Sequence, residues 1–173
     1  KWTHKRKINA VELWDKIMTK AYNTGEYGVF FYDNLNKDNN TWYVETIICT
    51  NPCGEYVSGQ VHKYDANEYM GACNLGSLFL HNFVENPYTQ NAKVNYDLLK
   101  ATISTAVRFL DNIIDINKYP YPAYKNYQMN VRTIGLGYTG LATLMTMLNI
   151  KYGSKESEVF AFELADFIAS CAY

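Results

Sequence analysis

Residues 51–55 read Asn51-Pro52-Cys53-Gly54-Glu55. Proline has no N–H to donate and glycine loses the most entropy when it is ordered, so this stretch predicts a tight, exposed turn rather than a helix or a central strand. Its amide, thiol and carboxylate are groups that can hold a hydroxylated substrate, attack it and move a proton. From these residues alone, a buried cysteine in an ordinary turn is the alternative, because free cysteine behaves mostly as a small hydrophobe.

A second cysteine follows twenty positions later, in Gly71-Ala72-Cys73-Asn74-Leu75-Gly76-Ser77. Together the two stretches resemble the active-site finger loop of ribonucleotide reductase large subunits, in which Asn-(Leu/Pro)-Cys-x-Glu is followed by a second cysteine before Asn-Leu-x-Ser. The resemblance continues in the same order through most of the chain, over residues 28–36, 106–112, 119–122 and 132–142.

The resemblance implies an α/β fold, a helix-rich segment of the ten-stranded α/β barrel of ribonucleotide reductases. Residues 1–173 would form a single partial domain, with the finger loop near residues 49–56. The last helical pattern runs to Tyr173 without a Gly cap or a Pro stop. We therefore expect a fragment of a larger catalytic barrel that is inactive as an isolated chain.

The resemblance also implies reduction of ribonucleotides to deoxyribonucleotides by thiyl-radical chemistry. Cys53 would become the thiyl radical, Glu55 would accept a proton from the sugar, and Asn51 would bind the sugar hydroxyls. Cys73 would be one half of the dithiol that supplies the reducing equivalents. Its partner lies upstream of the finger loop in the family, and no cysteine precedes Cys49 in this chain.

Several partners follow from the same resemblance. They are the ribonucleotide substrate, the remaining reductase segments or subunits, and a reductant of the thioredoxin or glutaredoxin type. The radical source would be adenosylcobalamin or a metal-containing small subunit. Asn-Pro-Cys-Gly-Glu favours cobalamin, whereas the long stretch between Tyr56 and Met70 argues against it. A non-catalytic remnant that associates with other reductase pieces is the alternative function.

Composition bounds these expectations. The 173 residues are 48% hydrophobic and carry a net charge of −1, which gives one core and no electrostatic reason to bind nucleic acid or a membrane. Four cysteines without paired spacing do not indicate a secreted disulfide scaffold, and no signal peptide is evident. We expect a cytoplasmic protein.

Hydrophobic periodicity and capping residues predict the local structure. A first helix is expected through Val11 and Ala21 to Gly25, followed by a buried strand at residues 29–32. Partly helical structure is expected over residues 74–84. Further elements are a long helix capped by Asn95, a strand at 131–134, a helix at 139–148 and a last helix capped by Ser154.

Two other binding patterns compete with this interpretation. Gly135-x-Gly137-x-x-Gly140 satisfies the dinucleotide fingerprint, but a helical pattern occupies the place where the second strand and its acidic residue should follow. We expect instead a place where two backbone segments cross closely. Zinc ligation is disfavoured because the candidate ligands lack short Cys-x-x-Cys spacing; we predict no metal in this chain. Those candidates are Cys49, Cys53, His62 and Cys73.

Overall fold

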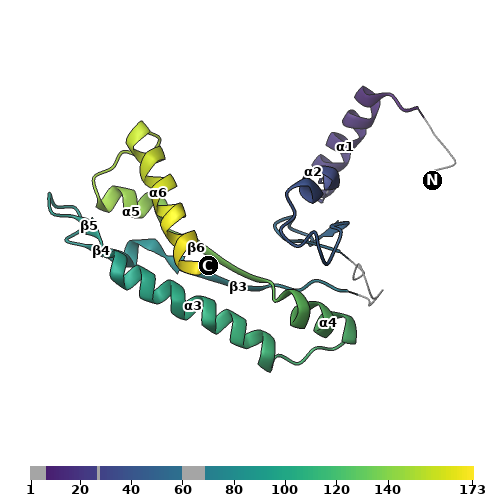
Figure 1. Cartoon of the computed structure of the whole chain (residues 1–173). Coiled ribbons are helices and arrows are strands. Elements are labelled where there is room, and N and C mark those ends of the chain that lie inside the picture. The colour runs from purple at the N-terminus through teal and green to yellow at the C-terminus, as the bar shows by residue number, and fades with distance from the viewer. Residues whose placement is uncertain (1–6, 27, 60–68) are drawn as a thin grey trace. The chain divides into compact units, whose positions relative to one another are not determined.

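The computed structural model describes residues 7–26, 28–59 and 69–173. The chain divides into two compact units, residues 1–63 and 64–173. Figure 1 labels helices α1 to α6 and strands β3 to β6. The first unit carries the Asn-Pro-Cys-Gly-Glu stretch and the second carries Cys73, so each unit is described by itself.

The first helix of the first unit has the predicted position. Helix α1 spans Ala10–Thr24. The side chain of Asn9 caps its first turn by accepting hydrogen bonds from the N–H groups of Val11 and Glu12. Gly25 ends it with φ 72°, a left-handed conformation that glycine adopts without steric cost.

The strand predicted at residues 29–32 is wrong. Residues 28–31 have no regular structure, and helix α2 follows at Tyr32–Lys37. Phe31 is 65% exposed. An apolar run becomes a strand only where neighbours pack on its pleated surface, and sequence alone does not show that these neighbours are missing.

The described part of the first unit contains a short antiparallel hairpin. Strand β1, Cys49–Thr50, pairs with β2, Val57–Ser58. Cys49 stands opposite Ser58, and Thr50 stands opposite Val57. Residues 51–56 therefore form the tip of the hairpin. The loop expected between Tyr56 and Met70 lies partly outside the described residues, because 60–68 are not described.

A parallel pair of strands forms the centre of the second unit. Strand β3, Asn74–Phe79, pairs with β6, Ile134–Thr139, over the full length of both strands. Helix α3, Tyr96–Ile116, runs along this pair, as Figure 1 shows. The predicted caps of α3 and of helix α6, Lys155–Ala172, are confirmed, because Asn95 and Ser154 each accept a backbone N–H.

The partly helical structure expected over residues 74–84 is confirmed only near the end of this stretch. This stretch is strand β3 followed by a 3₁₀ helix, η1, at Leu80–Phe83. Burial within β3 follows a period of two, with Leu78 buried while Leu75 and Phe79 are 65% and 55% exposed. Gly76 and Ser77 stand between Leu75 and Leu78, and they obscured this alternation in the sequence.

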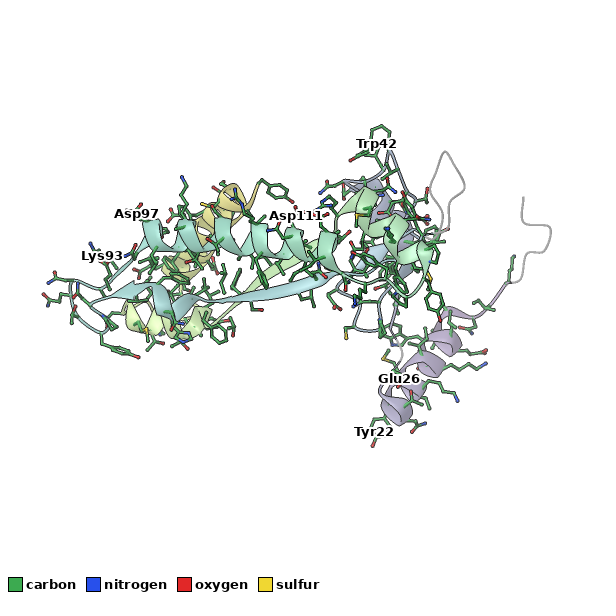
Figure 2. The ribbon with its side chains drawn as sticks, turned by 90° about the horizontal axis from the view of Figure 1, so that it is seen from below. Tyr22, Glu26, Trp42, Lys93, Asp97 and Asp111 are labelled. Atoms are coloured by element: carbon green, nitrogen blue, oxygen red, sulfur yellow. The ribbon has the colours of Figure 1, made fainter. Side chains whose placement is uncertain are left out.

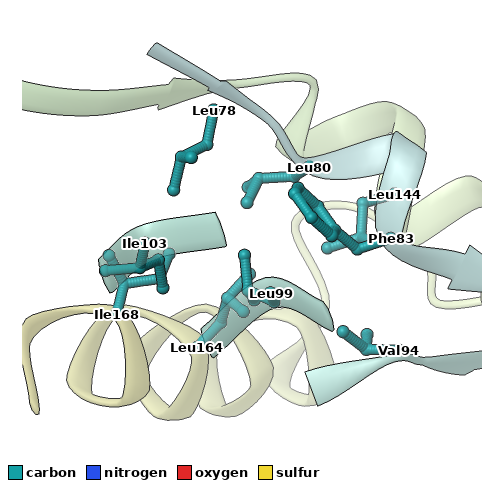
Figure 3. Close-up of a cluster of buried hydrophobic side chains, with 9 residues drawn as sticks. All are labelled: Leu78, Leu80, Phe83, Val94, Leu99, Ile103, Leu144, Leu164 and Ile168. Carbon is teal, nitrogen blue, oxygen red and sulfur yellow. The ribbon is translucent and has the colours of Figure 1, made fainter. Parts of the chain in front are cut away.

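The hydrophobic core of the second unit lies between β3, η1, α3 and α6, with α5 (Leu141–Met147) closing one side. Leu99 and Ile103 on α3 are fully buried, and Leu164 of α6 packs with them. The short strands β4 (Val84–Glu85) and β5 (Lys93–Val94) form an antiparallel pair next to this core. Figure 3 shows the nine side chains of the cluster, which come from elements far apart in the sequence.

Helix α4 spans Pro122–Val131, with Pro122 in its first turn, where proline is favoured. The strand expected from residue 131 begins at Ile134, because Arg132 ends α4 with a left-handed φ of 54°. None of the described helices is long and apolar enough to cross a bilayer.

Arg132 joins the end of α4 to two carboxylates of α3. Its guanidinium donates to Asp111 Oδ1 at 2.8 Å and to Asp115 Oδ1 at 2.9 Å. Asp111, labelled in Figure 2, lies in the C-terminal half of α3. The hydrogen bond from Arg132 lowers the pKa of the Asp111 carboxyl below its ordinary value of 3.8.

Because of this ion pair, we expect the fold to lose part of its stability in acid. Because the pKa of Asp111 is lowered by folding, the stabilisation is present above pH 3.8 and is lost as the pH falls through the folded pKa. Arg132→Asn should flatten the acid limb of a stability curve measured by thermal melting at a series of pH values. Asn tolerates the left-handed conformation, so the variant isolates the ion pair. An unchanged acid limb would contradict this account.

Candidate active site

The tip of the β1–β2 hairpin is organised by Asn51. The N–H of Asn51 donates to the carbonyl oxygen of Tyr56 at 3.0 Å, which closes the loop. The side-chain oxygen of Asn51 accepts from the N–H groups of Gly54 at 3.0 Å and Tyr56 at 3.1 Å. Gly54 has φ 86°, which favours glycine. Asn51 therefore builds the turn with its side-chain oxygen, a role that the sequence interpretation missed.

This arrangement brings three of the predicted site residues together. Asn51, Cys53 and Glu55 occupy one six-residue tip, and the thiol of Cys53 and the side chain of Glu55 are exposed. Within the described residues, the amide nitrogen of Asn51 makes no hydrogen bond. The tip thus presents an amide donor, a free thiol and a carboxylate to whatever approaches it.

The stem below the tip is anchored by side chains that the sequence interpretation missed. Glu45 is 2% exposed, and its Oε2 accepts from the N–H of Gly59 at 2.7 Å while its Oε1 accepts from Thr41 Oγ1 at 2.8 Å. A Cβ at Gly59 would lie 2.8 Å from the carbonyl oxygen of Thr46, so only glycine fits there. The sequence did carry a signal for this anchor, because the carboxylate of Glu45 lies inside the apolar run at residues 44–48.

Asn36 of α2 holds the other side of the stem. Its Nδ2 donates to the carbonyl oxygen of Ile47 at 2.7 Å, and its Oδ1 accepts from the N–H of Ile47 at 2.8 Å. This side-chain amide satisfies both backbone groups of one residue, as a neighbouring strand would. Cys49 is also used in the stem, because its Sγ donates to the carbonyl oxygen of Ser58 at 3.2 Å.

Cys73 lies in the second unit, in a segment that is firmly docked on α4. The ring of Tyr69 packs edge-on against Tyr127, with 5.2 Å between ring centroids. The N–H of Met70 donates to the carbonyl oxygen of Ala123 at 3.3 Å. These contacts fix the chain immediately before the cysteine.

Both neighbours of Cys73 are held by hydrogen bonds. Gln128, only 1% exposed, donates from its Nε2 to the carbonyl oxygen of Ala72. Asn74 donates from its Nδ2 to the carbonyl oxygen of Leu110 on α3, at 3.2 Å. The thiol of Cys73 is half-buried and is not in a disulfide. Asn51, Cys53 and Glu55 lie in the first unit, so the structure describes Cys73 separately from them.

The dinucleotide interpretation of the glycine pattern is wrong. Gly135 and Gly137 lie within strand β6 itself, and only Gly140 stands at the start of α5. A phosphate-binding fingerprint needs its glycines in the turn between strand and helix. The expected close approach of backbone segments has a concrete form here, because β6 pairs in parallel with β3.

The described part of the chain does not form the zinc site that the four candidate ligands would require. His62 lies outside the described residues, and the residues that are described contain no group of three or more His, Cys, Asp or Glu side chains placed to hold a metal.

Comparison with known proteins decides the family. The family model for the ribonucleotide reductase barrel domain matches residues 1–173. The chain belongs to the ribonucleotide reductase barrel family. This confirms the resemblance and the fold class, an α/β segment of that barrel.

Individual relatives agree with the family assignment. The chain is 36% identical to the vitamin B12-dependent ribonucleoside-diphosphate reductase of Thermoplasma acidophilum over 94% of its own length. It is 37% identical to the ribonucleoside-diphosphate reductase subunit alpha of Chlamydia pneumoniae over 95% of its length. It is 31% identical to the ribonucleoside-diphosphate reductase large chain of Schizosaccharomyces pombe over 92% of its own length. The chain spans 20%, 15% and 19% of these three relatives, respectively.

Proposed function

We propose that this chain is a catalytic segment of a ribonucleotide reductase, which reduces ribonucleotides to deoxyribonucleotides for DNA synthesis. The observation that carries the proposal is the hairpin tip, where an exposed thiol, a carboxylate and an amide donor stand within six residues of a reductase-family chain. A remnant that only packs against other reductase pieces has no need to keep all three groups on one exposed turn. The catalytic interpretation is therefore favoured.

Each group of the tip has a task in this proposal. Cys53, as a thiyl radical, takes the hydrogen atom from the 3′ carbon of the ribose, so that an S–H bond forms and the unpaired electron moves to the sugar. Glu55 accepts the proton of the 3′ hydroxyl, since a carboxylate accepts hydrogen bonds and can act as a base. The amide nitrogen of Asn51 donates to a sugar hydroxyl while its oxygen holds the turn.

Cys73 supplies reducing equivalents in the same proposal. Two thiols are oxidised to a disulfide, and the two electrons and two protons that they lose reduce the sugar and release water. The partner thiol must come within bridging distance of the Cys73 sulfur. A reductant of the thioredoxin or glutaredoxin type then reduces the disulfide by thiol exchange.

The radical is supplied from outside the described residues. Relatives named vitamin B12-dependent support adenosylcobalamin. Relatives named as a large chain or a subunit alpha support a second subunit, which in this proposal is the small subunit that contains the metal. Either group, when bound, supplies the unpaired electron that Cys53 carries. The exposed position of Cys53 fits a thiol that receives its radical from a separate group.

The remaining partners follow from the proposed reaction. They are a ribonucleotide and the other reductase segments or subunits, without direct contacts to nucleic acid or a membrane. The chemistry requires reduced thiols, and none of the four cysteines is in a disulfide, which supports a cytoplasmic location. The test of the function is deoxynucleotide production by a complete reductase containing this chain, supplied with a radical source and a dithiol. A complete, folded enzyme that produces none would overturn the proposal.

Glu55→Gln should separate substrate binding from chemistry. The amide keeps the shape of the side chain but cannot accept a proton, so we expect unchanged ribonucleotide affinity and a turnover lower by roughly 10²- to 10⁴-fold. Because Glu55 is exposed on the tip, the fold should not change. Rapid-quench measurement of deoxynucleotide formation, beside equilibrium binding of the nucleotide, provides the check. Turnover at the unsubstituted rate would remove Glu55 from the mechanism.

A further inference from the structure

The base of the β1–β2 hairpin holds all the buried residues of the described part of the first unit. They are Glu45, Ile47, Ser58 and Gly59. Ile47 is the single apolar side chain among the four, which is too little for a hydrophobic core within these residues. The hairpin has only two pairs of facing residues, and so short a hairpin is marginally stable in water. The polar contacts at its base therefore decide where the tip lies.

The carboxylate of Glu45 joins the two arms of the hairpin to the turn before them. Glu45 precedes the first arm, and its Oε2 accepts from the N–H of Gly59, at the end of the second arm, at 2.7 Å. Its Oε1 accepts from Oγ1 of Thr41 at 2.8 Å. The backbone of Gly59 lies so close that a Cβ there would stand 3.2 Å from Glu45 Oε2. The carboxylate thus sets the spacing of the two arms at the base.

The two arms are held in different ways. Asn36 ties the first arm to α2, because its side chain binds both backbone groups of Ile47. Residues 57–59 of the second arm are joined by hydrogen bonds to the first arm and to Glu45. Loss of the Glu45 contacts would leave the first arm attached to α2 while the second arm gains freedom to move. The tip, which connects the arms, would move with it.

We propose that Glu45 is a positioning residue that holds the hairpin tip, and with it Cys53 and Glu55, in place for attack on the ribose. The proposal rests on the proposed function, in which these two side chains act on the sugar. Glu45 itself lies at the base of the hairpin and acts through the spacing of the arms. Reacting groups must be held in close alignment, and a displacement of about 1 Å can lower the rate roughly 10²-fold.

Glu45→Gln and Glu45→Met separate hydrogen bonding from packing. Glutamine can accept from the N–H of Gly59 and donate to Thr41 Oγ1, whereas methionine fills a similar space and makes neither contact. In the complete reductase, we expect Glu45→Met to lower kcat per folded enzyme roughly 10²-fold without changing the KM for the ribonucleotide. Glu45→Gln should restore most of the rate. The control Glu12→Met replaces an exposed glutamate of α1 and should turn over like the wild type.

Hydrogen–deuterium exchange of the tip provides a readout that does not depend on activity. Gly54 and Tyr56 donate their N–H groups to Asn51, so exchange of these two amides reports how well the turn is held. We expect exchange about tenfold faster in Glu45→Met than in the wild type, and unchanged in Glu45→Gln. Thermal melting confirms the fold of each variant. If Glu45→Met does not fold, Thr41→Val removes one of the two hydrogen bonds at nearly constant size and should show the same changes to a smaller extent.

The results that overturn the proposal are distinct from failure of the proposed function. Wild-type kcat and wild-type exchange in folded Glu45→Met, or in Thr41→Val where it replaces that variant, would overturn the positioning role. Losses in Glu45→Gln equal to those in Glu45→Met would also overturn it. If exchange rises in Glu45→Met alone but the complete wild-type enzyme makes no deoxynucleotide, the positioning role stands and the proposed function fails. If the wild type and Glu45→Met reduce ribonucleotides equally well, the positioning role fails and the function stands.

Discussion

Cys53→Ser is expected to abolish deoxynucleotide formation by the reductase that contains this chain, without unfolding it. A serine O–H bond is stronger than a thiol S–H bond, so the hydroxyl does not form the radical under the same driving force. Cys53 is exposed on the hairpin tip, where serine has nearly the same shape as cysteine. A steady-state assay of deoxynucleotide production, with thermal melting to confirm the fold, provides the check.

Cys49→Ser is the matched control for this substitution. Cys49 lies four residues earlier in the same hairpin, where its sulfur donates to the carbonyl oxygen of Ser58. A serine hydroxyl can make that hydrogen bond, so this variant should keep both fold and turnover. Deoxynucleotide formation by purified Cys53→Ser, or equal inactivation by Cys49→Ser, would contradict the assignment of Cys53.

Cys73→Ser should block the reaction at a later step. The substitution removes the reductant but leaves the thiyl site of Cys53 in place, so the substrate radical still forms. We expect exchange of the 3′ hydrogen or release of the base, with no net deoxynucleotide. Product analysis by chromatography, with labelled nucleotide, distinguishes this pattern from simple inactivation.

Cys171→Ser is the control for the second unit. Cys171 lies on α6, half-buried against the hydrophobic core, and has no role in the proposed chemistry. Its variant should reduce ribonucleotides normally if it folds. If Cys73→Ser also turns over normally with a dithiol, Cys73 is only a packing residue and the proposed redox pair lies elsewhere.

Helices α1, α3 and α6 were predictable because their signals are local. Asn95 and Ser154 cap α3 and α6 through their own side chains, and Gly25 ends α1 with a left-handed φ. These features lie within one turn of the helix ends, together with a 3.6-residue apolar period. Strand β3 was missed because its partner β6 is sixty residues away, and only that pairing makes its alternation of buried and exposed residues meaningful.

The exposed turn of the candidate site was predictable, but the contacts that support the turn were not. The order of residues at the hairpin tip indicated the exposed turn, and the side-chain oxygen of Asn51 completes it. Glu45 reaches Gly59 across fourteen residues, and Gln128 reaches Ala72 across fifty-six. Such contacts join a side chain to a distant backbone group and leave no periodic pattern in the sequence.

Release of tritium from ribonucleotide labelled at the 3′ carbon tests the central claim, that Cys53 starts the reaction at the ribose. The complete reductase should be compared as wild type, Cys53→Ser and Cys73→Ser. The account predicts release by the wild type and by Cys73→Ser, and none by Cys53→Ser. Release by Cys53→Ser, or its absence from the active wild type, would contradict the account.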